Sequence, residues 1–492
     1  MKLSRLFLAF VLLLASCTSP EILGSTDGKS TGSVTIGYAE PLSSYSPLSY
    51  EAVNRRYFCN MYEGLVRYDG TFNYETALAV SWGRLDDTTW DFRLREGVTF
   101  HDGSVFDADD VLYSLQIARE SGSELSALLS TIVEVNKTDT YRLQIKTSRP
   151  DPLLLNKLTY VYMVPSGYSN FDLPIGTGPY RVSQFVDDTL VLERYDEYWG
   201  ALAYFAEARL SYIPDPQERL DAFLSGEVQV LANVPPQYVE EIEAAGASVE
   251  DFPSLEVSYL LLNTAGPFAN EHLRAAVWNA LGIDYTEQFG GGYLLPTSQY
   301  AALGITGYDS SFEDRAPDLE TALAERALVD GPVSLTLELP QGLEVLGTAI
   351  QEDLAAIDIT VTVSTTGGAD YEDKISSGLS DFYFFGWKYD LADSEDFFDA
   401  VIHTPTGAYG EFNHFAYSNP QLDSLIEGAS TQLQSTQRRM ILEEISMLLL
   451  ADQVVLPLFE SQVLYAVHPS VYYDFRLDGQ LWASEIVENV LK

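Results

Sequence analysis

The chain has 492 residues, of which 46% are hydrophobic and 12% aromatic, and its 28 basic and 72 acidic residues give a formal net charge of −44. This length exceeds what one hydrophobic core usually serves, so two or three domains are expected. A surface this acidic repels phosphate groups, which excludes DNA and RNA as partners.

The N-terminus carries the pattern of an export signal. Two basic residues precede the apolar run 6–15, which is too short for a permanent membrane-spanning helix and fits the core of a signal peptide. The run leads into Leu-Ala-Ser-Cys, ending at Cys17, which resembles the lipobox of bacterial lipoproteins. That resemblance implies that residues 1–16 are removed and that Cys17 receives a lipid. The alternative is an ordinary signal peptide followed by an incidental cysteine.

Residues 17–33 are rich in Ser, Thr, Gly and Asp without periodicity, and we expect a flexible tether. Beyond them, alternation of period two predicts strands, and apolar residues spaced by three or four predict helices. Cys59 has no cysteine there to pair with, so we expect a buried, inert thiol. Strands are expected at residues 34–38, 90–94, 98–100, 131–135, 141–146, 190–194, 228–231, 259–263, 334–339, 359–363 and 454–459, and helices at 54–68, 107–118, 153–158, 219–226, 235–245, 273–281, 343–354 and 443–450.

Residues 89–115 hold a regular local pattern. Trp90, Phe92 and Leu94 alternate with charged residues, as in a strand with one buried face. Two glycine-containing turns follow. Asp107 then precedes Asp110 by three residues, the spacing of a helix N-cap with a capping box. The segment therefore predicts a hairpin that leads into a capped helix.

The sequence Gly-Thr-Gly-Pro-Tyr at residues 176–180 is rich in glycine. A phosphate-binding loop would continue with Gly-Lys-Ser or Gly-Lys-Thr and open a helix, and this sequence does neither. We therefore expect a tight turn at which two backbones approach closely.

These segments together resemble family 5 of the extracellular solute-binding proteins, the peptide and nickel receptors of ABC importers. That family carries a strand ending in Leu-Arg, a Phe-His-Asp-Gly turn and an Asp-Asp-Val helix start, all present within residues 89–115. It also shows Tyr-Glu-Gly-Leu-Val, here at 62–66, Gly-Thr-Gly-Pro-Tyr at 176–180 and Tyr-Trp at 198–199. The resemblance covers residues 34–480.

The resemblance implies an α/β chain with the two-lobed periplasmic-binding-protein fold of type 2, cluster C. Lobe I would comprise residues 34–51, 174–263 and 453–492, with an extra subdomain, residues 52–173, inserted in it. Lobe II would comprise residues 264–452.

Patterns typical of enzymes and metal sites are weak in this chain. Its five histidines form no HxxxH pair and its cysteines no CxxC pair, so a structural zinc site is unsupported. His403 and His414 flank a glycine-containing loop and are the alternative candidates for a metal in a cleft. There is no Gly-x-Ser-x-Gly elbow, and neighbouring carboxylates carry little information in so acidic a chain. We expect no catalytic activity, no cofactor and no metal.

The segment 381–393 is the main candidate for ligand binding. An aromatic strand runs into a loop that carries Trp387, Tyr389 and two carboxylates. The segment resembles the family's Gly-Trp followed by an Asp, which in the peptide-binding members pairs with the α-ammonium group of the ligand. Asp390 occupies the matching position. A carboxylate shielded by Trp387 and Tyr389 would recognise a cation with high discrimination.

The chain departs from the family pattern in this loop. Ser394 stands where the family usually has Pro, and Leu391-Ala392 where Tyr-Pro is common. The departure leaves the fold unaffected but weakens the peptide assignment. The alternative for Asp390 is a solvated loop residue, and Trp387 fits a core position as well as a ligand platform.

Three further residues are candidate ligand contacts. Asn413 and His414 precede Tyr-Ser-Asn-Pro at 417–420, which matches a family stretch near the cleft. Tyr45 lies in the loop after the first strand and would face the cleft from lobe I.

The resemblance implies a lipid-anchored, extracytoplasmic receptor of an ABC importer, which captures peptides between its lobes and delivers them to a membrane permease. Its partners would be a small-molecule ligand, the permease and ATPase subunits, and the membrane through the lipid alone, and it would be a monomer. One alternative is the same fold binding a nickel chelate, haem, an oligosaccharide or an opine-like compound. Another is a ligand-sensing or adhesive lipoprotein without transport.

Overall fold

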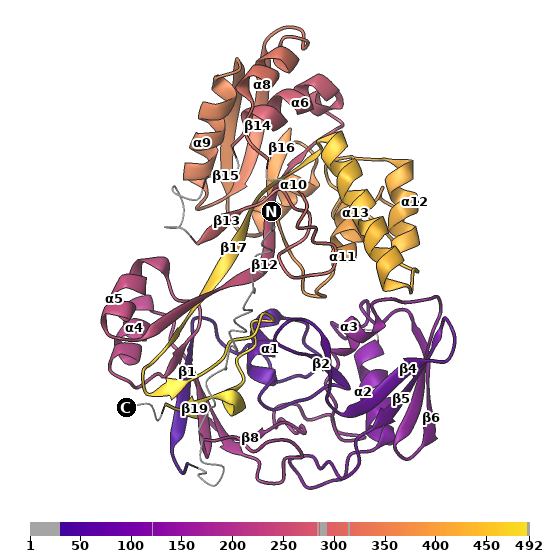
Figure 1. Ribbon diagram of the computed structural model, residues 1–492, viewed down its shortest axis with the longest axis vertical. Coiled ribbons are helices and arrows are strands. Elements are labelled where there is room, and N and C mark those ends of the chain that lie inside the picture. The colour runs from indigo at the N-terminus through magenta and orange to yellow at the C-terminus, as the bar shows by residue number, and fades with distance from the viewer. Residues whose placement is uncertain (1–29, 121, 283–284, 286–292, 313–314, 490–492) are drawn as a thin grey trace, which may run out of the picture.

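The computed structural model describes residues 30–120, 122–282, 285, 293–312 and 315–489. Two bodies joined by long strands make up this part of the chain (Figure 1). The expected signal peptide at residues 1–16 and the expected lipid attachment at Cys17 lie outside the described residues.

A sheet that contains 11 strands among the described residues runs through both lobes. Across the sheet the strands are β15 (Ile359–Thr366), β14 (Val333–Pro340), β16 (Phe382–Lys388), β12 (Ser248–Leu262), β17 (Val455–Val467), β11 (Val230–Leu231), β1 (Ser33–Tyr38), β10 (Glu207–Tyr212), β9 (Thr189–Arg194) and β8 (Tyr180–Val186), with β13 (Leu294–Pro296) paired to β17. In lobe I, β1 is parallel to both of its neighbours, β10 and β11. In lobe II, β14 is parallel to both β15 and β16. Each lobe therefore has the parallel centre of an α/β sheet.

The strands β12 and β17 connect the lobes as one antiparallel pair, which crosses the middle of the molecule diagonally in Figure 1. The register shifts between Pro253 and Val257, and Leu255 between them has a positive φ of 63°. An interrupted ladder bends more easily than a regular one, so this stretch is the natural hinge. The strand expected at 259–263 is only the end of β12, because the earlier residues form a strand through long-range pairing with β17.

Helices and short segments pack around the sheet in both lobes. Those of lobe I and its chain ends are α4 (Pro216–Leu224), η1 (Pro236–Tyr238), α5 (Val239–Ala244), β18 (Val471–Tyr472), η4 (Ala483–Glu485) and β19 (Val487–Glu488). Those of lobe II are η2 (Pro267–Ala269), α6 (Glu271–Ala280), α8 (Leu319–Arg326), α9 (Glu344–Ala355), α10 (Ala369–Ser376), α11 (Glu395–Phe397), η3 (Phe398–Ile402), α12 (Pro420–Ala429) and α13 (Ser435–Asp452).

The segment that follows β1 forms a smaller body beside lobe I, with its own sheet and buried core. The helix α1 (Ala52–Phe58) leads into it and packs Tyr57 and Phe58 into the core of lobe I. The elements of the smaller body are β2 (Val66–Tyr68), β3 (Tyr74–Thr76), β4 (Ala79–Arg84), β5 (Thr89–Leu94), α2 (Ala108–Arg119), β6 (Ile132–Asp139), β7 (Arg142–Thr147) and α3 (Leu154–Leu158). The capping box of α2 is confirmed: the Asp107 carboxylate accepts the N–H of Asp109 at 2.7 Å, and that of Asp110 accepts the N–H of Asp107 at 2.8 Å. The strand expected at 98–100 is reduced to a single bridge between Thr99 and Val105.

The turn at residues 176–180 is the close backbone approach that its glycines predict. The N–H of Gly178 donates to the carbonyl of Met61 at 3.0 Å, and that of Tyr180 to the carbonyl of Asn60 at 3.1 Å. A Cβ at Gly178 would lie 2.6 Å from the carbonyl carbon of Met61. Because Asn60 and Met61 pair with this turn, the helix expected at 54–68 is wrong beyond the end of α1 at Phe58.

Cys59 lies just after α1 and is 1% exposed. Burial raises the pKa of its thiol well above the usual range, as expected for an inert side chain. Within the described ranges, no helix is long and apolar enough to cross a membrane.

Candidate functional site

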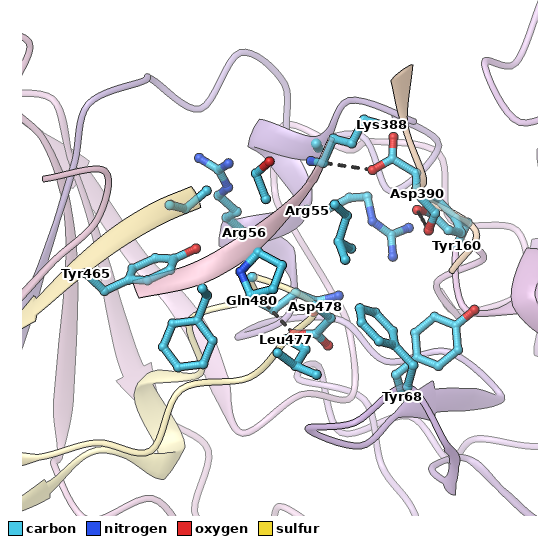
Figure 2. Close-up of a pocket in the computed structure, with 18 residues that line it drawn as sticks. Arg55, Arg56, Tyr68, Tyr160, Lys388, Asp390, Tyr465, Leu477, Asp478 and Gln480 are labelled. Carbon is cyan, nitrogen blue, oxygen red and sulfur yellow. Dashed lines mark hydrogen bonds and ion pairs between the residues drawn. The ribbon is translucent and has the colours of Figure 1, made fainter. Parts of the chain in front are cut away.

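A cavity of about 70 Å³ lies between the lobes, beside the hinge (Figure 2). A buried water needs about 10–15 Å³ on this scale, so the cavity has room for a few water molecules. The residues that line it lie on α1, in the smaller body, on the connecting strands β12 and β17, at the end of β16 and in the segment 477–480. The polar and charged residues that line it are Arg55, Arg56, Tyr68, Tyr160, Ser254, Lys388, Asp390, Tyr465, Asp478 and Gln480.

The cavity lining has more basic than acidic residues, whereas the chain as a whole is strongly acidic. Three cationic side chains, Arg55, Arg56 and Lys388, face the cavity together with two carboxylates, Asp390 and Asp478. The chain around them has 72 acidic and 28 basic residues. Basic residues are therefore concentrated here, and the cavity can accommodate an anionic group despite the acidic exterior.

Arg55 extends from α1 beneath Asp390 toward Tyr160 (Figure 2). Its guanidinium carbon lies 3.4 Å from the centroid of the Tyr160 ring. Nη2 donates to the carbonyl of Thr159 at a long 3.5 Å, while Nη1 is buried and has no hydrogen-bond partner among the described residues. Arg55 is only 8% exposed, so one strong donor of this side chain is withdrawn from bulk water without a partner among the described residues.

Asp390 lies in the loop after β16 and faces the cavity from lobe II. Its carboxylate Oδ1 is 3.5 Å from Nζ of Lys388, and both side chains are about one third exposed, at 28% and 34%. A pair this exposed contributes little to stability. The carboxylate is therefore able to exchange Lys388 for another cation.

The two lobes touch through the backbone of the same loop. The hydroxyl of Tyr160 donates to the carbonyl of Asp390 at 2.6 Å, and the amide Nδ2 of Asn156 donates to the carbonyl of Leu391 at 2.7 Å. Tyr68 adds a third bond to the carbonyl of Leu391, at 3.3 Å. These hydrogen bonds fasten lobe II to the smaller body, so the structure is a closed arrangement of the lobes.

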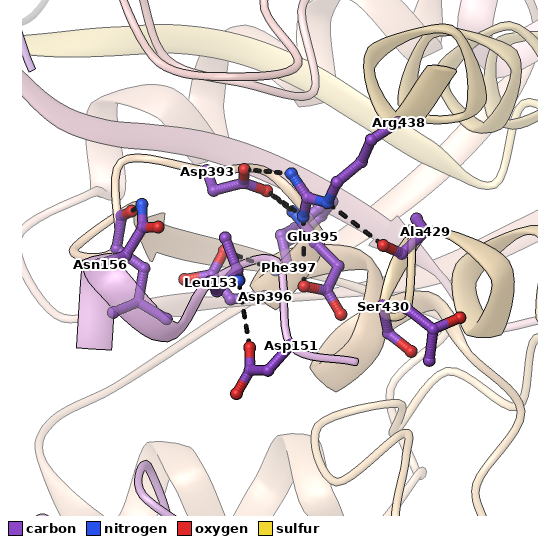
Figure 3. A network of polar contacts seen from close by, with 12 residues as sticks. Asp151, Leu153, Asn156, Asp393, Glu395, Asp396, Phe397, Ala429, Ser430 and Arg438 are labelled. Carbon is purple, nitrogen blue, oxygen red and sulfur yellow. Dashed lines mark hydrogen bonds and ion pairs between the residues drawn. The ribbon is translucent and has the colours of Figure 1, made fainter. Parts of the chain in front are cut away.

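A buried ion-pair network holds the loop behind Asp390 (Figure 3). Nη2 of Arg438, on α13, lies 2.9 Å from Oδ1 of Asp393 and 3.2 Å from Oε2 of Glu395. All three residues are at most 6% exposed. Burial raises the pKa of Glu395 to about 7, and Arg438 opposes that rise. Because the partners are buried and close, the network fixes the end of the loop that presents Asp390.

The aromatic residues next to Asp390 do not line the cavity in this closed arrangement. Tyr389 is fully buried, and its hydroxyl bonds to the hydroxyl of Tyr259 and the carbonyl of Tyr300, both at 2.6 Å. Trp387 is half-buried against the core of lobe II, and its Nε1 is 3.4 Å from Oδ1 of Asp396. Both side chains anchor the strand end from which Asp390 projects.

The remaining candidates also lie outside the cavity lining. The Nδ2 of buried Asn413 donates to the carbonyls of His403 and Tyr417, at 3.0 and 2.9 Å. His414 is half-buried nearby, and burial lowers its pKa. Tyr45 is half-buried in lobe I, where its ring meets that of Phe185 edge-on at 6.3 Å. In the part of the chain that the structure describes, no group of three His, Cys, Asp or Glu side chains is arranged to hold a metal ion.

Three residues that line the cavity were not predicted from the sequence: Arg55, Tyr160 and Asp478. They belong to three segments that are far apart in the chain and carry no shared motif. For Arg55 one signal was available: it forms an Arg-Arg pair with its neighbour in a chain that is poor in basic residues.

Residues 73–408 match the family model described as bacterial extracellular solute-binding proteins, family 5 Middle. A dipeptide-binding protein of Escherichia coli is 24% identical over 425 residues, which cover 75% of this chain and 78% of that protein.

Solved structures agree with this match. The structure of HbpA2 from Haemophilus parasuis superposes with a TM-score of 0.85 at 18% identity, over 93% of this chain and all of that one. NikA from Brucella suis in complex with Fe(III)-EDTA superposes with a TM-score of 0.81 at 20% identity, again over 93% of this chain and all of that one. The two-lobed periplasmic-binding-protein fold is thereby confirmed.

Proposed function

The chain belongs to family 5 of the bacterial extracellular solute-binding proteins, and on this premise we propose that it is the solute receptor of an ABC importer and that its solutes are peptides. The observation that carries the proposal is the cavity between the lobes, which is lined by charged side chains from both of them. A solute held there is enclosed when the lobes close and released when they open.

The peptide assignment is supported by Asp390 and by the relative named as a dipeptide-binding protein. In this proposal the α-ammonium group of the peptide replaces Nζ of Lys388 beside the Asp390 carboxylate. The exchange is favourable because a cation enclosed between the lobes interacts with Asp390 in a less polar medium than Lys388, which is about one third exposed, does.

Loading requires the lobes to separate. A cavity of about 70 Å³ is too small for a peptide of two or more residues, so in this proposal the lobes that hold a peptide lie farther apart than in this structure. The interrupted ladder between Pro253 and Val257 supplies the hinge, and the hydrogen bonds to the carbonyls of Asp390 and Leu391 are the contacts that opening breaks.

The finer parts of the proposal concern location and partners. We place the receptor outside the cytoplasm, anchored through a lipid on Cys17, as a monomer that docks on a permease served by an ATPase. Mass spectrometry of the mature chain tests the anchor, with the Cys17→Ser chain as control. The expected result is a lipid-sized mass increase in the wild type only, and an unmodified Cys17 would contradict it.

The identity of the solute tests the peptide assignment. The chain is purified under native conditions and unfolded, and the released small molecules are identified by mass spectrometry. The expected solutes are short peptides. A metal chelate is the second candidate, because the three cationic residues of the cavity suit a polycarboxylate. A chelate, haem or oligosaccharide as the released solute would contradict the peptide assignment and leave the receptor function standing.

A further inference from the structure

We propose that the contact between Arg149 and Ser430 is a latch between the lobes, which sets how long the closed arrangement lasts and therefore how slowly the solute leaves. This inference rests on the proposed receptor function and deepens it, since it assigns control of release to two residues that do not line the cavity.

The latch joins two segments that are far apart in the chain and belong to different lobes. Arg149 follows β7 in the smaller body, and Ser430 follows α12 in lobe II. Nη1 of Arg149 donates to Oγ of Ser430 at 2.6 Å and lies 3.5 Å from the carbonyl oxygen of the same residue. Because its donor is charged, this bond is stronger than the neutral hydrogen bonds that Tyr160 and Asn156 make to lobe II.

The end of α12 is suited to receive a cation. The last carbonyl groups of a helix carry a partial negative charge, which stabilises a basic side chain placed there. Within lobe II, Nε of Arg438 already donates to the carbonyl of Ala429 at 3.2 Å (Figure 3). The hydroxyl of Ser430 donates to the carbonyl of Glu427 at 2.9 Å, so its single hydrogen is used and its oxygen is left to accept from Arg149.

The segment that carries Arg149 is fixed on both sides of this residue. The N–H of Ser148 donates to the carbonyl of Thr131 at 2.8 Å. Oδ2 of Asp151 lies 2.7 Å from Nζ of Lys157. The backbone therefore presents the arginine to lobe II from a defined position.

A carboxylate of lobe II adds to the attraction across the latch. Asp399 lies in η3, and burial raises its pKa to about 6. The basic residues that oppose this rise are, in order of effect, Arg149, His403 and Lys157. Since Arg149 and Lys157 belong to the smaller body, the two lobes attract each other here as well as fit together.

The latch lies away from the hinge. In Figure 1, α12 and the strands β4, β5 and β6 lie at the right-hand edge of the molecule, and β12 and β17 cross to their left. By contrast, Tyr160 bonds to Asp390, just beyond Lys388, which pairs with Glu256 on the hinge strand β12. When two bodies rotate about a hinge, the points farthest from it separate most. Opening therefore has to break the latch at an early stage.

Solvent lies next to the latch. A groove of about 400 Å³ is lined by residues 84–87 and Pro150 of the smaller body and by residues 431–434 of lobe II. Pro150 and Thr431 are the neighbours in sequence of the two latch residues. Water from this groove can hydrate Arg149 as the bond breaks, so the latch is reversible.

Pulsed electron resonance measures the fraction of closed chains and tests the inference. Spin labels are attached at Val133→Cys on β6 and Met440→Cys on α13, both more than half exposed, in a Cys17→Ser background. Trialanine is added to this labelled parent chain until half of the chains are closed. The variants are then compared at the same concentration.

Two variants test the latch from its two sides. Arg149→Met removes the guanidinium and keeps an extended side chain, and Ser430→Ala removes the hydroxyl that accepts from it. The matched control is Arg142→Met, which removes the same charge from the same body but breaks a pair within that body, with Asp91 at 2.9 Å.

We expect about one sixth of the Arg149→Met chains to be closed at this concentration, because loss of the bond lowers the closed-to-open ratio roughly fivefold. Ser430→Ala should lower the closed fraction less, since the carbonyl oxygen remains, and should have no further effect when Arg149→Met is present. Arg142→Met should remain at one half. An unchanged closed fraction in Arg149→Met would overturn the inference. A further fall when Ser430→Ala is added to Arg149→Met would overturn it as well, because the two residues would then act separately.

Failure of the proposed function gives a different result, which is seen in the labelled parent chain alone. If trialanine closes none of these chains but the small molecules released from the unfolded wild-type chain do, the peptide assignment is wrong, and the same comparison with the released molecules tests the latch. If neither changes the distances, the receptor function is wrong, and the inference falls with it.

Discussion

Asp390 takes part in the closed arrangement through its backbone, while its side chain faces the cavity. Its carbonyl accepts from Tyr160, and among the described residues its carboxylate forms an ion pair with Lys388, which is about one third exposed, and interacts electrostatically with Arg55. A substitution that changes only the carboxylate therefore separates solute binding from folding.

We expect Asp390→Asn to weaken the binding of trialanine by at least about tenfold, because the asparagine carries no charge to attract the α-ammonium group. The thermal midpoint should change little, since the backbone hydrogen bond remains. Calorimetric titration and differential scanning calorimetry measure the two effects. Asp221→Asn, at an exposed position on α4, is the control and should change neither. An unchanged affinity in Asp390→Asn would assign the carboxylate no role in binding.

Glu460 is a buried carboxylate on the hinge strand β17, with an exposure of 4%. It accepts the N–H of Leu303 at 3.0 Å, and its other oxygen, Oε1, has no partner among the described residues. Burial raises its pKa to about 7. The pKa of Glu460 in the folded chain thus lies above its value in the unfolded chain, near 4.5. The contribution of Glu460 to the free energy of unfolding is therefore fully present below about pH 4.5 and is lost as the pH rises through about 7.

Glu460→Gln should therefore stabilise the chain at pH 8, by on the order of 1–3 kcal/mol, and have little effect at pH 4. Urea unfolding at the two pH values measures the difference. Glu444→Gln, at an exposed position on α13, is the control. A variant that is destabilised at pH 8 would show that the ionised form of Glu460 is favourable in the folded chain.

At the level of elements, α3 and the residues after it control how firmly the lobes stay closed. Asn156 and Tyr160 donate to the backbone of the loop after β16, which belongs to lobe II. The receiving loop is itself fixed by Arg438. Both sides of this contact are thus held in place, and its strength depends on a few hydrogen bonds.

Tyr160→Phe should shift the lobes toward the open arrangement without solute. It removes one hydrogen bond, worth about 1 kcal/mol or roughly a fivefold change in the closed-to-open ratio, and keeps the ring against Arg55. Small-angle X-ray scattering should show a larger radius of gyration than in the wild type. Tyr113→Phe also removes a hydroxyl that donates to a backbone carbonyl, that of Tyr168, but outside the lobe interface, and should leave the radius unchanged. An identical radius for all three chains would contradict the role of Tyr160.

At the level of the whole molecule, the fold could be predicted from local patterns, and the cavity could not. The capped helix α2 and the glycine turn at 176–180 depend on neighbouring residues, so short motifs were enough. Asp390 could be predicted as a candidate ligand-binding residue because a family motif surrounds it. Arg55 and Asp478 lie beside the same cavity as Asp390 only because β12 and β17 hold the lobes together. No local sequence pattern predicts this long-range proximity.

The central claim is that two lobes close on a solute, and the distance between them tests it most directly. Spin labels at Val133→Cys on β6 and Met440→Cys on α13, both more than half exposed, report that distance by pulsed electron resonance in a Cys17→Ser background, where the remaining Cys59 is buried. We expect a distribution with long distances without solute and a single shorter distance once the solute released from the wild type is added. One unchanged distribution, with or without solute, would contradict the claim.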